Sequence, residues 1–275
     1  MVTCSIVAYN NPVEMLSTAI KSFLDASSTQ AVFYLIDNSP LDDLRKLAEM
    51  DGRIIYVHNP SNPGFGAAHN LAIKKAKALG SMYHLVLNPD VYFGSDVIEK
   101  LKQFMDQHPE VGNVMPKVLY PDGEIQYLCK LLPTPYDWIG RRFNPVKSMV
   151  DKRNQVFELR FTGYNQRMEV PYLSGCFMFL RMSALENIGL FDENIFMYGE
   201  EADLCRRLIG SGYKTVFYPD AEIYHHFEKG SHKTMKLSLI GIRSAIYYFS
   251  KWGWLFDTTR VSINKKTLDQ LNYKN

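Results

Sequence analysis

Hydrophobic and polar positions follow two alternating patterns over residues 1–110. Short apolar runs typical of buried strands are VTCSIVAY, AVFYLIDN, RIIYVHN and YHLVL. Between them, PVEMLSTAIKSFLDA and FGAAHNLAIKKAKALG carry apolar residues at helical spacing, and the second helix is expected to stop at Gly80. The strand runs are continuous rather than alternating, as expected where helices cover both faces of a sheet. The pattern predicts an α/β fold with a mostly parallel central sheet flanked by helices.

After Phe93 the alternation of strand-like and helix-like patterns becomes less regular. SDVIEKLKQFMDQ predicts a helix with Ser95 as its cap, and residues 115–170 predict loops and short strands such as KVLY. VPYLSGCFMFLRM predicts a buried strand, and residues 189–226 read as a turn, a helix, a strand and a short second strand, AEIY. We expect a main domain over 1–232, with halves 1–110 and 111–232, and a helical appendage over 233–275.

Composition narrows the class of protein. The chain has 275 residues, of which 46% are hydrophobic and 22% charged, so it can bury a large core. No secretory signal opens it, and no uncharged apolar stretch reaches the ~18 residues of a membrane-spanning helix. The four cysteines are far apart without metal-site spacing. We therefore expect a cytoplasmic protein with reduced thiols.

The C-terminal segment is basic and aromatic. Residues 226–275 hold nine Lys and Arg residues against three acidic residues. This positive charge indicates an anionic partner, which is either a membrane surface or nucleic acid. The alternative is a solvated helical face, which the charge alone does not exclude. MKLSLIGIRSAIYYFSKWGWLF could lie on an anionic membrane, peripherally, with Tyr247, Tyr248, Trp252 and Trp254 among the headgroups. The alternative is a helix that packs on its own domain or on a second subunit in a homodimer.

Polar clusters follow each predicted strand of the first half: AYNNP, IDNS, NPSNPGFGAAHN and NPD. Ligands of open α/β sheets bind beyond the carboxyl ends of the strands, although these residue types are also ordinary turn formers. Asp37 could accept the imide N–H of uracil or thymine, or it could form an Asx-turn. The small residues of GFGAAHN could let the backbone approach a diphosphate or sugar, or serve helix packing. The stretch is neither a Walker A motif nor a G-x-G-x-x-G, which excludes an ATPase or dehydrogenase on this basis.

Two further groups of residues carry candidate chemistry. Asp90, at a strand end, is a hard oxygen ligand suited to Mg²⁺ or Mn²⁺, and His225 is a candidate second ligand, with His226 and His232 as alternatives. Glu200, Glu201 and Asp203 open a predicted helix. Acids in a first turn are favoured by the helix dipole, but mutual repulsion could also raise one pKa and create a general base.

Taken together and in order, these motifs resemble the family 2 glycosyltransferases with a GT-A fold, in particular the rhamnosyltransferase-like branch. The resemblance covers roughly residues 2–232 and rests on SIVAYN, IDNS, NPSNPGFGAAHN, LVLNPDV, YLSGCFMFLR, GLFDENIFMYGEEADLCRRL and GYKTVFYPDAEIYHH. It implies that Asp90 is the metal-binding acid of the DxD motif, with Asn88 at its first position, and that His225 is the late metal-binding histidine. It also implies a nucleotide-sugar pocket made by Ala8, Tyr9, Asn10, Asp37, Asn38, Asn62, Gly64, Phe65, Asn70 and Asn88.

In the family that the sequence resembles, the catalytic base is the Asp of a Glu-Asp pair. The corresponding residues of this chain are Glu200 and Glu201. Glu201 therefore takes the base position with one extra methylene, and catalysis is sensitive to shifts of about 1 Å. The resemblance implies an inverting transfer, dependent on Mn²⁺ or Mg²⁺, of a sugar such as L-rhamnose from a dTDP- or UDP-sugar. The expected acceptor is a hydroxyl of a saccharide or lipid-linked saccharide in surface polysaccharide synthesis, with no nucleic-acid partner. The alternatives are a non-catalytic sugar-nucleotide-binding module and a nucleotidyltransferase.

Overall fold

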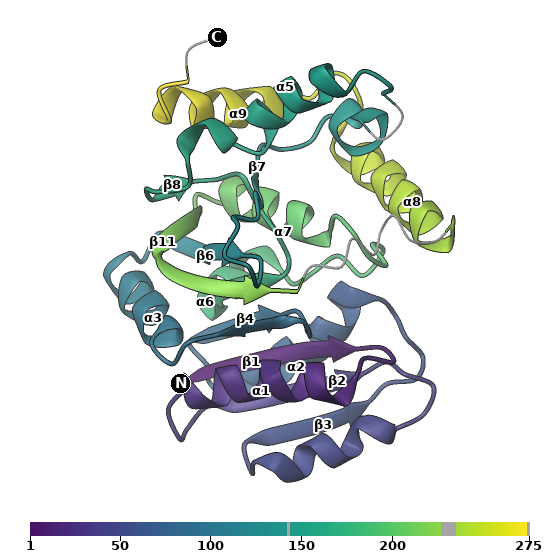
Figure 1. Ribbon diagram of the computed structural model, residues 1–275, viewed down its shortest axis with the longest axis vertical. Helices are drawn as coiled ribbons and strands as arrows, with labels where there is room; N and C mark the ends of the chain where they lie inside the picture. The colour runs from purple at the N-terminus through teal and green to yellow at the C-terminus, as the bar shows by residue number, and fades with distance from the viewer. Residues whose placement is uncertain (142–143, 227–234, 274–275) are drawn as a thin grey trace.

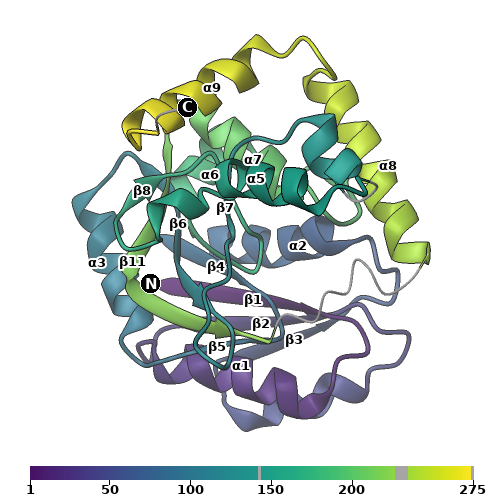
Figure 2. The ribbon, with the colours of Figure 1, turned by 45° about the horizontal axis from the view of Figure 1, so that its top comes forward.

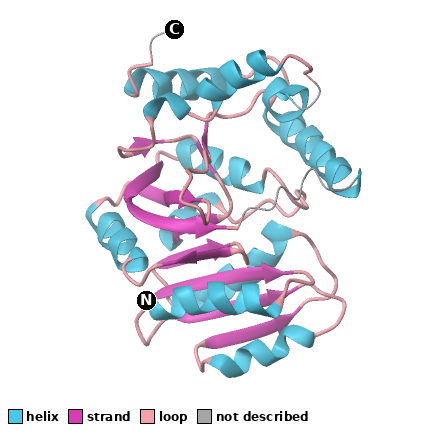
Figure 3. Ribbon diagram, viewed as in Figure 1, coloured by secondary structure: helices cyan, strands magenta, loops and turns pink. Residues whose placement is uncertain are grey.

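The structure is a computed structural model that describes residues 1–141, 144–226 and 235–273. Helices and strands alternate through its first half, and helices dominate the C-terminal end (Figure 3). The expected boundary between residues 232 and 233, and the alternative ligand His232, lie outside the described residues.

The core is one mixed sheet with the order β3-β2-β1-β4-β10-β6-β11-β5, and β8 pairs with β11 (Figure 1). The first four neighbours are parallel: β1 (Val2–Ala8), β2 (Val32–Asp37), β3 (Ile54–His58) and β4 (Tyr83–Leu87). All five residues of β4 are buried, as its uninterrupted apolar sequence predicts for a central strand. The sequence-based expectation of a parallel N-terminal half is confirmed.

The second half of the sheet is mixed. β10 (Phe177–Arg181) runs antiparallel to both β4 and β6 (Val111–Leu119), and β11 (Lys214–His225) runs parallel to β6. β11 is a single strand with a register shift between Tyr218 and Glu222, where the sequence predicted two strands separated by Pro219. The short elements are β5 (Val91–Phe93), β7 (Cys129–Lys130), β8 (Met168–Glu169) and β9 (Tyr172–Leu173).

Helices cover both faces of the sheet. α1 (Val13–Asp25) and α2 (Phe65–Ala78) lie on opposite faces (Figure 2). The apolar positions that predicted α1 are the ones it buries, from Leu16 to Leu24. The other helices are η1 (Asp43–Met50), α3 (Val97–Gln107), η2 (Tyr136–Gly140), α5 (Lys147–Phe157), η3 (Arg160–Thr162), α6 (Met182–Ile188), α7 (Glu200–Gly210), α8 (Met235–Trp252) and α9 (Thr258–Gln270). α3 begins after Asp96, so Ser95 is not its cap residue.

The C-terminal helices pack on the rest of the chain through α7. Arg206 on α7 and Asp257, before α9, form a buried bidentate ion pair with N–O distances of 2.6 and 2.7 Å. Tyr248 of α8 is fully buried, and the Trp252 indole donates to Asp203 on α7. Of the expected alternatives for this segment, packing on its own domain is thus present, and Tyr248 is unavailable to a membrane. Among the described residues, no helix is both long and apolar enough to cross a bilayer.

A chain of buried polar side chains crosses the sheet between β1, β4 and α2. His84 lies with Nδ1 2.8 Å from Thr3 Oγ1 and Nε2 2.8 Å from Ser5 Oγ, which is also 2.7 Å from His69 Nδ1. Burial lowers the pKa of His84 to about 3 and that of His69 well below its ordinary value. Both imidazoles are therefore neutral in the folded protein near neutral pH.

This network predicts acid sensitivity. Below pH ~6.5 the unfolded chain binds protons at these histidines while the folded chain does not, so the free energy of unfolding falls as pH drops. Each histidine contributes a slope of about 1.4 kcal/mol per pH unit until its folded pKa is reached. The free energy of unfolding, measured with urea, should fall less between pH 7 and pH 5 for His84→Gln than for the wild type. Equal falls would contradict this origin of the acid sensitivity.

Candidate active site

The predicted polar clusters meet at the carboxyl edge of the parallel strands. Backbone bonds join them: Asn38 N donates to Ala8 O, and Asn59 N donates to Asp37 O. Asn10 N donates to Ser39 Oγ at 2.9 Å, with Asn10 at a positive φ of 52°. The Asn38 amide donates to Asn62 Oδ1 at 3.2 Å. The loops after β1, β2 and β3 therefore form one continuous polar surface, with Tyr9 exposed at its edge.

Asp37 is fully buried at this surface, and both of its carboxylate oxygens accept a hydrogen bond. Ser39 N donates to Oδ1 at 2.9 Å, which is the expected Asx-turn, and Tyr56 OH donates to Oδ2 at 2.7 Å. Burial, followed by the Asp37 hydrogen bond, raises the pKa of Tyr56. Each carboxylate oxygen retains a second lone pair. Because the carboxylate is fully buried, the surrounding loops would have to move before a base could contact it, and base recognition stays a prediction.

The start of α2 lies against the loop that precedes α7. Gly64 has φ +106°, and a Cβ there would lie 2.3 Å from the Phe196 carbonyl oxygen. Phe65 N donates to that same oxygen at 2.8 Å. The Asn70 side chain is buried and exchanges hydrogen bonds with the Phe191 backbone. The structure therefore gives Gly64, Phe65 and Asn70 contacts with residues 191–196, and their contact with a nucleotide stays a prediction.

Asp90 and His225 face each other across neighbouring strand ends. Asp90 Oδ1 lies 3.3 Å from His225 Nε2, with His225 buried and the Asp90 side chain 18% exposed. The adjacent His226 donates its backbone N–H to Asp90 O, while its ring packs beside Tyr92. The geometry favours His225 over His226 as the partner of Asp90. Asn88 shapes the turn, because its carbonyl accepts from Val91 N and its N–H donates to Cys176 O.

This pair is suited to a divalent cation. A carboxylate and an imidazole nitrogen are ligands that Mn²⁺ accepts, and Mg²⁺ commonly completes its shell with water and substrate phosphates. In the described parts of the chain, no three His, Cys, Asp or Glu side chains form a metal-binding cluster. Within the described residues, an ion held by Asp90 and His225 would thus have no third ligand of these types, and water or substrate oxygens would complete its shell.

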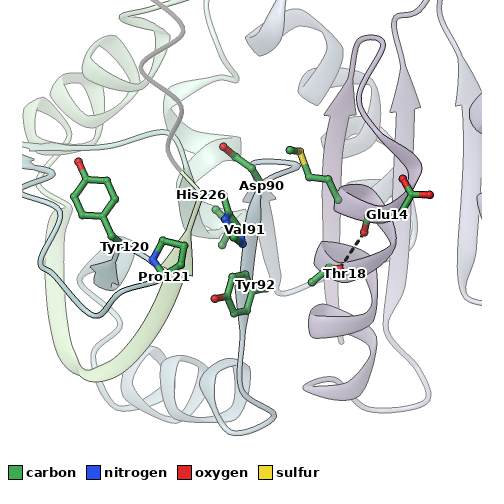
Figure 4. Close-up of a pocket in the computed structure, with 9 residues that line it drawn as sticks. Glu14, Thr18, Asp90, Val91, Tyr92, Tyr120, Pro121 and His226 are labelled. Atoms are coloured by element: carbon green, nitrogen blue, oxygen red, sulfur yellow. Dashed lines mark hydrogen bonds between the residues drawn. The ribbon is translucent and has the colours of Figure 1, made fainter.

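Open space adjoins Asp90. A cavity of 550 Å³ lies between α1, β5 and the loop at residues 120–121. Figure 4 shows Asp90, Tyr92, Tyr120 and His226 around it, with Glu14 and Thr18 of α1 on the far side. A smaller cavity of 360 Å³ adjoins Asn10 and Ser39. The first cavity thus gives access to Asp90, and the second gives access to the loops after β1 and β2.

The acids at the start of α7 have three different environments. Glu201 is partly exposed and oriented by two donors: Tyr172 OH reaches Oε1 at 3.0 Å, and Gly199 N reaches Oε2 at 2.9 Å. Glu200 is buried, and burial together with the Glu201 charge raises its pKa well above the ordinary value. Among the three acids, Glu201 therefore combines fixed geometry with access.

Asp203 is a structural residue in this arrangement. Its carboxylate is fully buried and receives Arg207 Nε at 2.8 Å, Trp252 Nε1 at 2.8 Å and Lys251 Nζ at 2.7 Å. These contacts connect α7 to α8 and occupy the carboxylate with three donors, and a catalytic role for Asp203 stays a prediction.

One short segment, Gly175–Cys176, lies between Glu201 and the turn that ends at Asp90. A Cβ on Gly175 would lie 3.5 Å from Glu201 Cβ, and the neighbouring Cys176 carbonyl accepts from Asn88 N in the turn that ends at Asp90. This is an ordinary van der Waals distance, so the segment packs directly beside the Glu201 side chain. The segment thus lies beside Glu201 and is hydrogen-bonded to the turn that ends at Asp90.

Three residues of the site were not predicted from the sequence. Tyr172 orients Glu201, Gly199 supplies a backbone donor from a positive φ of 104°, and Gln126 contacts His225 Nδ1 at 2.9 Å. Lys130 Nζ also lies over the Tyr172 ring, 5.2 Å from its centroid. Gln126 and Lys130 come from residues 115–170, where no periodic pattern or motif distinguishes them.

The sequence profile of Glycosyl transferase family 2 matches residues 3–189. The N-acetylglucosaminyl-diphospho-decaprenol L-rhamnosyltransferase of Mycobacterium tuberculosis (strain H37Rv) is 30% identical over 234 residues, 78% of this chain and 73% of that protein. The low-salt glycan biosynthesis hexosyltransferase Agl10 of Haloferax volcanii is 26% identical, covering 68% of this chain and 56% of that protein. Rhamnosyltransferase WbbL of Escherichia coli (strain K12) is 23% identical, covering 59% and 61%.

Two solved structures share the fold. GalNAc-T7 with UDP, GalNAc and Mn²⁺ superposes with a TM-score of 0.63 at 14% identity, covering 100% of this chain and 55% of that chain. Staphylococcus aureus TarS superposes with a TM-score of 0.59 at 15% identity, covering 98% and 43%. The chain thus spans about half the length of these two, and the likeness confirms the expected GT-A fold. With the profile matching more than half of its residues, the chain belongs to Glycosyl transferase family 2.

Proposed function

We propose that this protein is an inverting, metal-dependent glycosyltransferase that uses a dTDP- or UDP-sugar. The observation that carries the proposal is the 3.3 Å approach of Asp90 Oδ1 to His225 Nε2, joined through the Gly175–Cys176 segment to the oriented carboxylate of Glu201. Asp90 and His225 would hold Mn²⁺ or Mg²⁺, which when bound would neutralise charge on the departing diphosphate.

Glu201 acts as the general base in this proposal. Its carboxylate takes the proton of the acceptor hydroxyl while that oxygen bonds to the anomeric carbon and the bond to the nucleoside diphosphate breaks. Tyr172 and Gly199 hold the carboxylate in place through one hydrogen bond to each oxygen. The transfer is a single displacement and requires no nucleophilic Ser or Cys. The buried Cys176 and Cys205, whose thiol pKa values burial raises, agree with that.

The pyrimidine of the donor is assigned to Asp37. A carboxylate accepts the imide N–H of uracil and thymine alike, so it selects against cytosine and does not distinguish UDP from dTDP. With Mn²⁺ present, UDP and dTDP should raise the thermal unfolding midpoint, since a ligand that binds only the folded state stabilises it. CDP should raise the midpoint much less, because cytosine presents a lone pair at N3 where uracil and thymine present an N–H. A shift with CDP as large as with UDP and dTDP would remove the role of Asp37.

The transferred sugar and acceptor are inferred from the relatives. The Mycobacterium and Escherichia proteins are named rhamnosyltransferases, and the former is named for a lipid-linked N-acetylglucosaminyl acceptor. We therefore propose L-rhamnose and a polyprenyl-diphosphate-linked saccharide, as in surface polysaccharide synthesis. A non-catalytic binding module is disfavoured by the two hydrogen bonds that orient Glu201, which a module would not need.

For a lipid-linked acceptor we propose peripheral attachment, at the cytoplasmic face of an anionic membrane, through α8 and the loop after it. Leu255 and Phe256 are 75% and 97% exposed. The solvent side of α8 also carries an apolar stripe at helical spacing: Met235, Leu239, Ile242 and Ile246. Exposed Lys236 and Arg243 border the stripe. Apolar residues bordered by basic ones are the pattern of interfacial helices.

A pelleting experiment tests this surface. Leu255→Ser/Phe256→Ser should reduce pelleting with phosphatidylglycerol-containing vesicles, because it removes the most exposed apolar side chains. Leu41→Ser is the matched control, since Leu41 is 68% exposed on another part of the chain. Equal pelleting of both variants would contradict the membrane surface. A homodimer that dissociates in the double variant would instead assign this surface to a second copy of the chain.

A further inference from the structure

Gln126 is a buried side chain, and two of the three polar contacts described for it are with His225. Its Oε1 is 2.9 Å from His225 Nδ1. Its Nε2 donates to the His225 carbonyl oxygen at 2.7 Å and to the Leu119 carbonyl oxygen at 3.3 Å. The amide therefore contacts the histidine from both its ring and its backbone.

The position of Gln126 is fixed by the local backbone. After β6, the chain turns back at residues 120–124, and Leu119 pairs with Ile125 in an isolated antiparallel bridge. Gln126 N then donates to Val118 O at 2.9 Å. Because β11 runs beside β6 with Tyr224 opposite Leu119, this return places the Gln126 side chain next to His225.

The orientation of the amide determines where the imidazole proton lies. Two carbonyl oxygens can only accept hydrogen bonds, so the group that faces them must be the NH₂ of Gln126. Its Oε1 then faces His225 Nδ1, and an oxygen acceptor requires that Nδ1 carry a proton. In a neutral imidazole the other nitrogen, Nε2, then has a lone pair, and Nε2 is the atom 3.3 Å from Asp90 Oδ1.

We infer that Gln126 is a positioning residue that holds His225 in the Nδ1–H tautomer and so presents Nε2 as a metal ligand. The inference rests on the proposed metal site. Without Gln126, the Nε2–H tautomer could donate directly to the Asp90 carboxylate, which would close the site with a hydrogen bond. A partner that fixes the tautomer of a metal-binding histidine typically changes metal affinity by about 10–100-fold.

The first test is the tautomer of His225 in the metal-free protein. Nitrogen-15 shifts of labelled histidine, with His225 assigned by its loss in His225→Ala, distinguish the two tautomers. The wild type should show Nδ1–H. Gln126→Met, which has a similar length but no amide, should shift the population toward Nε2–H. A wild-type protein in which His225 is protonated at Nε2 would overturn the inference, whether or not the variant folds.

The second test is Mn²⁺ binding measured by electron paramagnetic resonance in the presence of UDP. Gln126→Met should weaken Mn²⁺ binding about 10–100-fold. The control is Gln103→Met, an exposed glutamine on α3 that bonds Glu99, and it should bind Mn²⁺ as the wild type does. Unchanged Mn²⁺ affinity in a folded Gln126→Met protein would refute the positioning role. Absence of Mn²⁺ binding by the wild type would instead refute the proposed metal site, and the inferred role with it, even if the Nδ1–H signature is present.

Discussion

Glu201→Gln is expected to lower kcat for sugar transfer by about 10²–10⁴-fold, the usual contribution of a general base. The amide keeps the shape of the side chain but cannot accept the acceptor proton. Glu200→Gln is the matched control on the neighbouring position. Glu200 is buried, and burial and the Glu201 charge raise its pKa, so an amide of the same shape should be better tolerated there than at Glu201.

The comparison of the two variants distinguishes a base from a structural acid. Steady-state transfer with saturating donor measures kcat for each, and circular dichroism checks that both fold. A loss in Glu200→Gln as large as in Glu201→Gln would contradict the assignment of the base. Glu201→Asp adds a distance test, because a carboxylate displaced by about 1 Å can lose about 10²-fold in rate.

Asp90→Asn is expected to abolish the stimulation of transfer by Mn²⁺ while leaving the fold intact. The carboxylate is partly exposed at a strand end, so the change leaves the apolar core untouched. It removes the negative charge that, with His225 Nε2, makes the pair suitable for a cation. Isothermal titration of Mn²⁺ in the presence of UDP measures the loss directly.

Asp96→Asn is the control for Asp90→Asn. Asp96 lies exposed after β5 and pairs with Lys100 at 2.6 Å, so its replacement should leave Mn²⁺ binding unchanged. Wild-type Mn²⁺ affinity and metal-dependent transfer in Asp90→Asn would refute the metal site.

Elements with local periodicity were predictable from the sequence. The parallel strands β1 to β4 and the helices α1 and α2 follow from apolar runs and helical spacing, because burial on both faces or on one stripe imposes these patterns. β11 was predicted as two strands because Pro219 interrupts its sequence. The register shift after Tyr218 lets the strand pass this point and resume pairing at Glu222.

The residues of the candidate site could be predicted from the sequence only where they belong to recognisable motifs. The motifs singled out Asp90 and His225, whose Oδ1 and Nε2 atoms lie 3.3 Å apart, and Glu201, and the roles of all three stay predictions. Gly64, Asn70 and Asp203 are engaged in packing contacts that no short stretch of sequence reveals. The partners of Glu201 and His225 come from far along the chain: Tyr172 is 29 residues from Glu201, and Gln126 is 99 residues from His225. Such contacts depend on the assembled sheet rather than on local sequence. The same holds for Tyr248, an aromatic expected at a membrane surface that lies buried in the interior.

The most direct test of the proposed reaction is the product formed from dTDP-L-rhamnose or a UDP-sugar and a polyprenyl-diphosphate-linked N-acetylglucosamine with Mn²⁺. Nuclear magnetic resonance of the product measures both the transfer and the anomeric configuration. The arrangement of Asp90, His225 and Glu201 predicts sugar transfer with inversion that stops when the metal is chelated. Transfer with retention, or transfer unaffected by chelation, would contradict it.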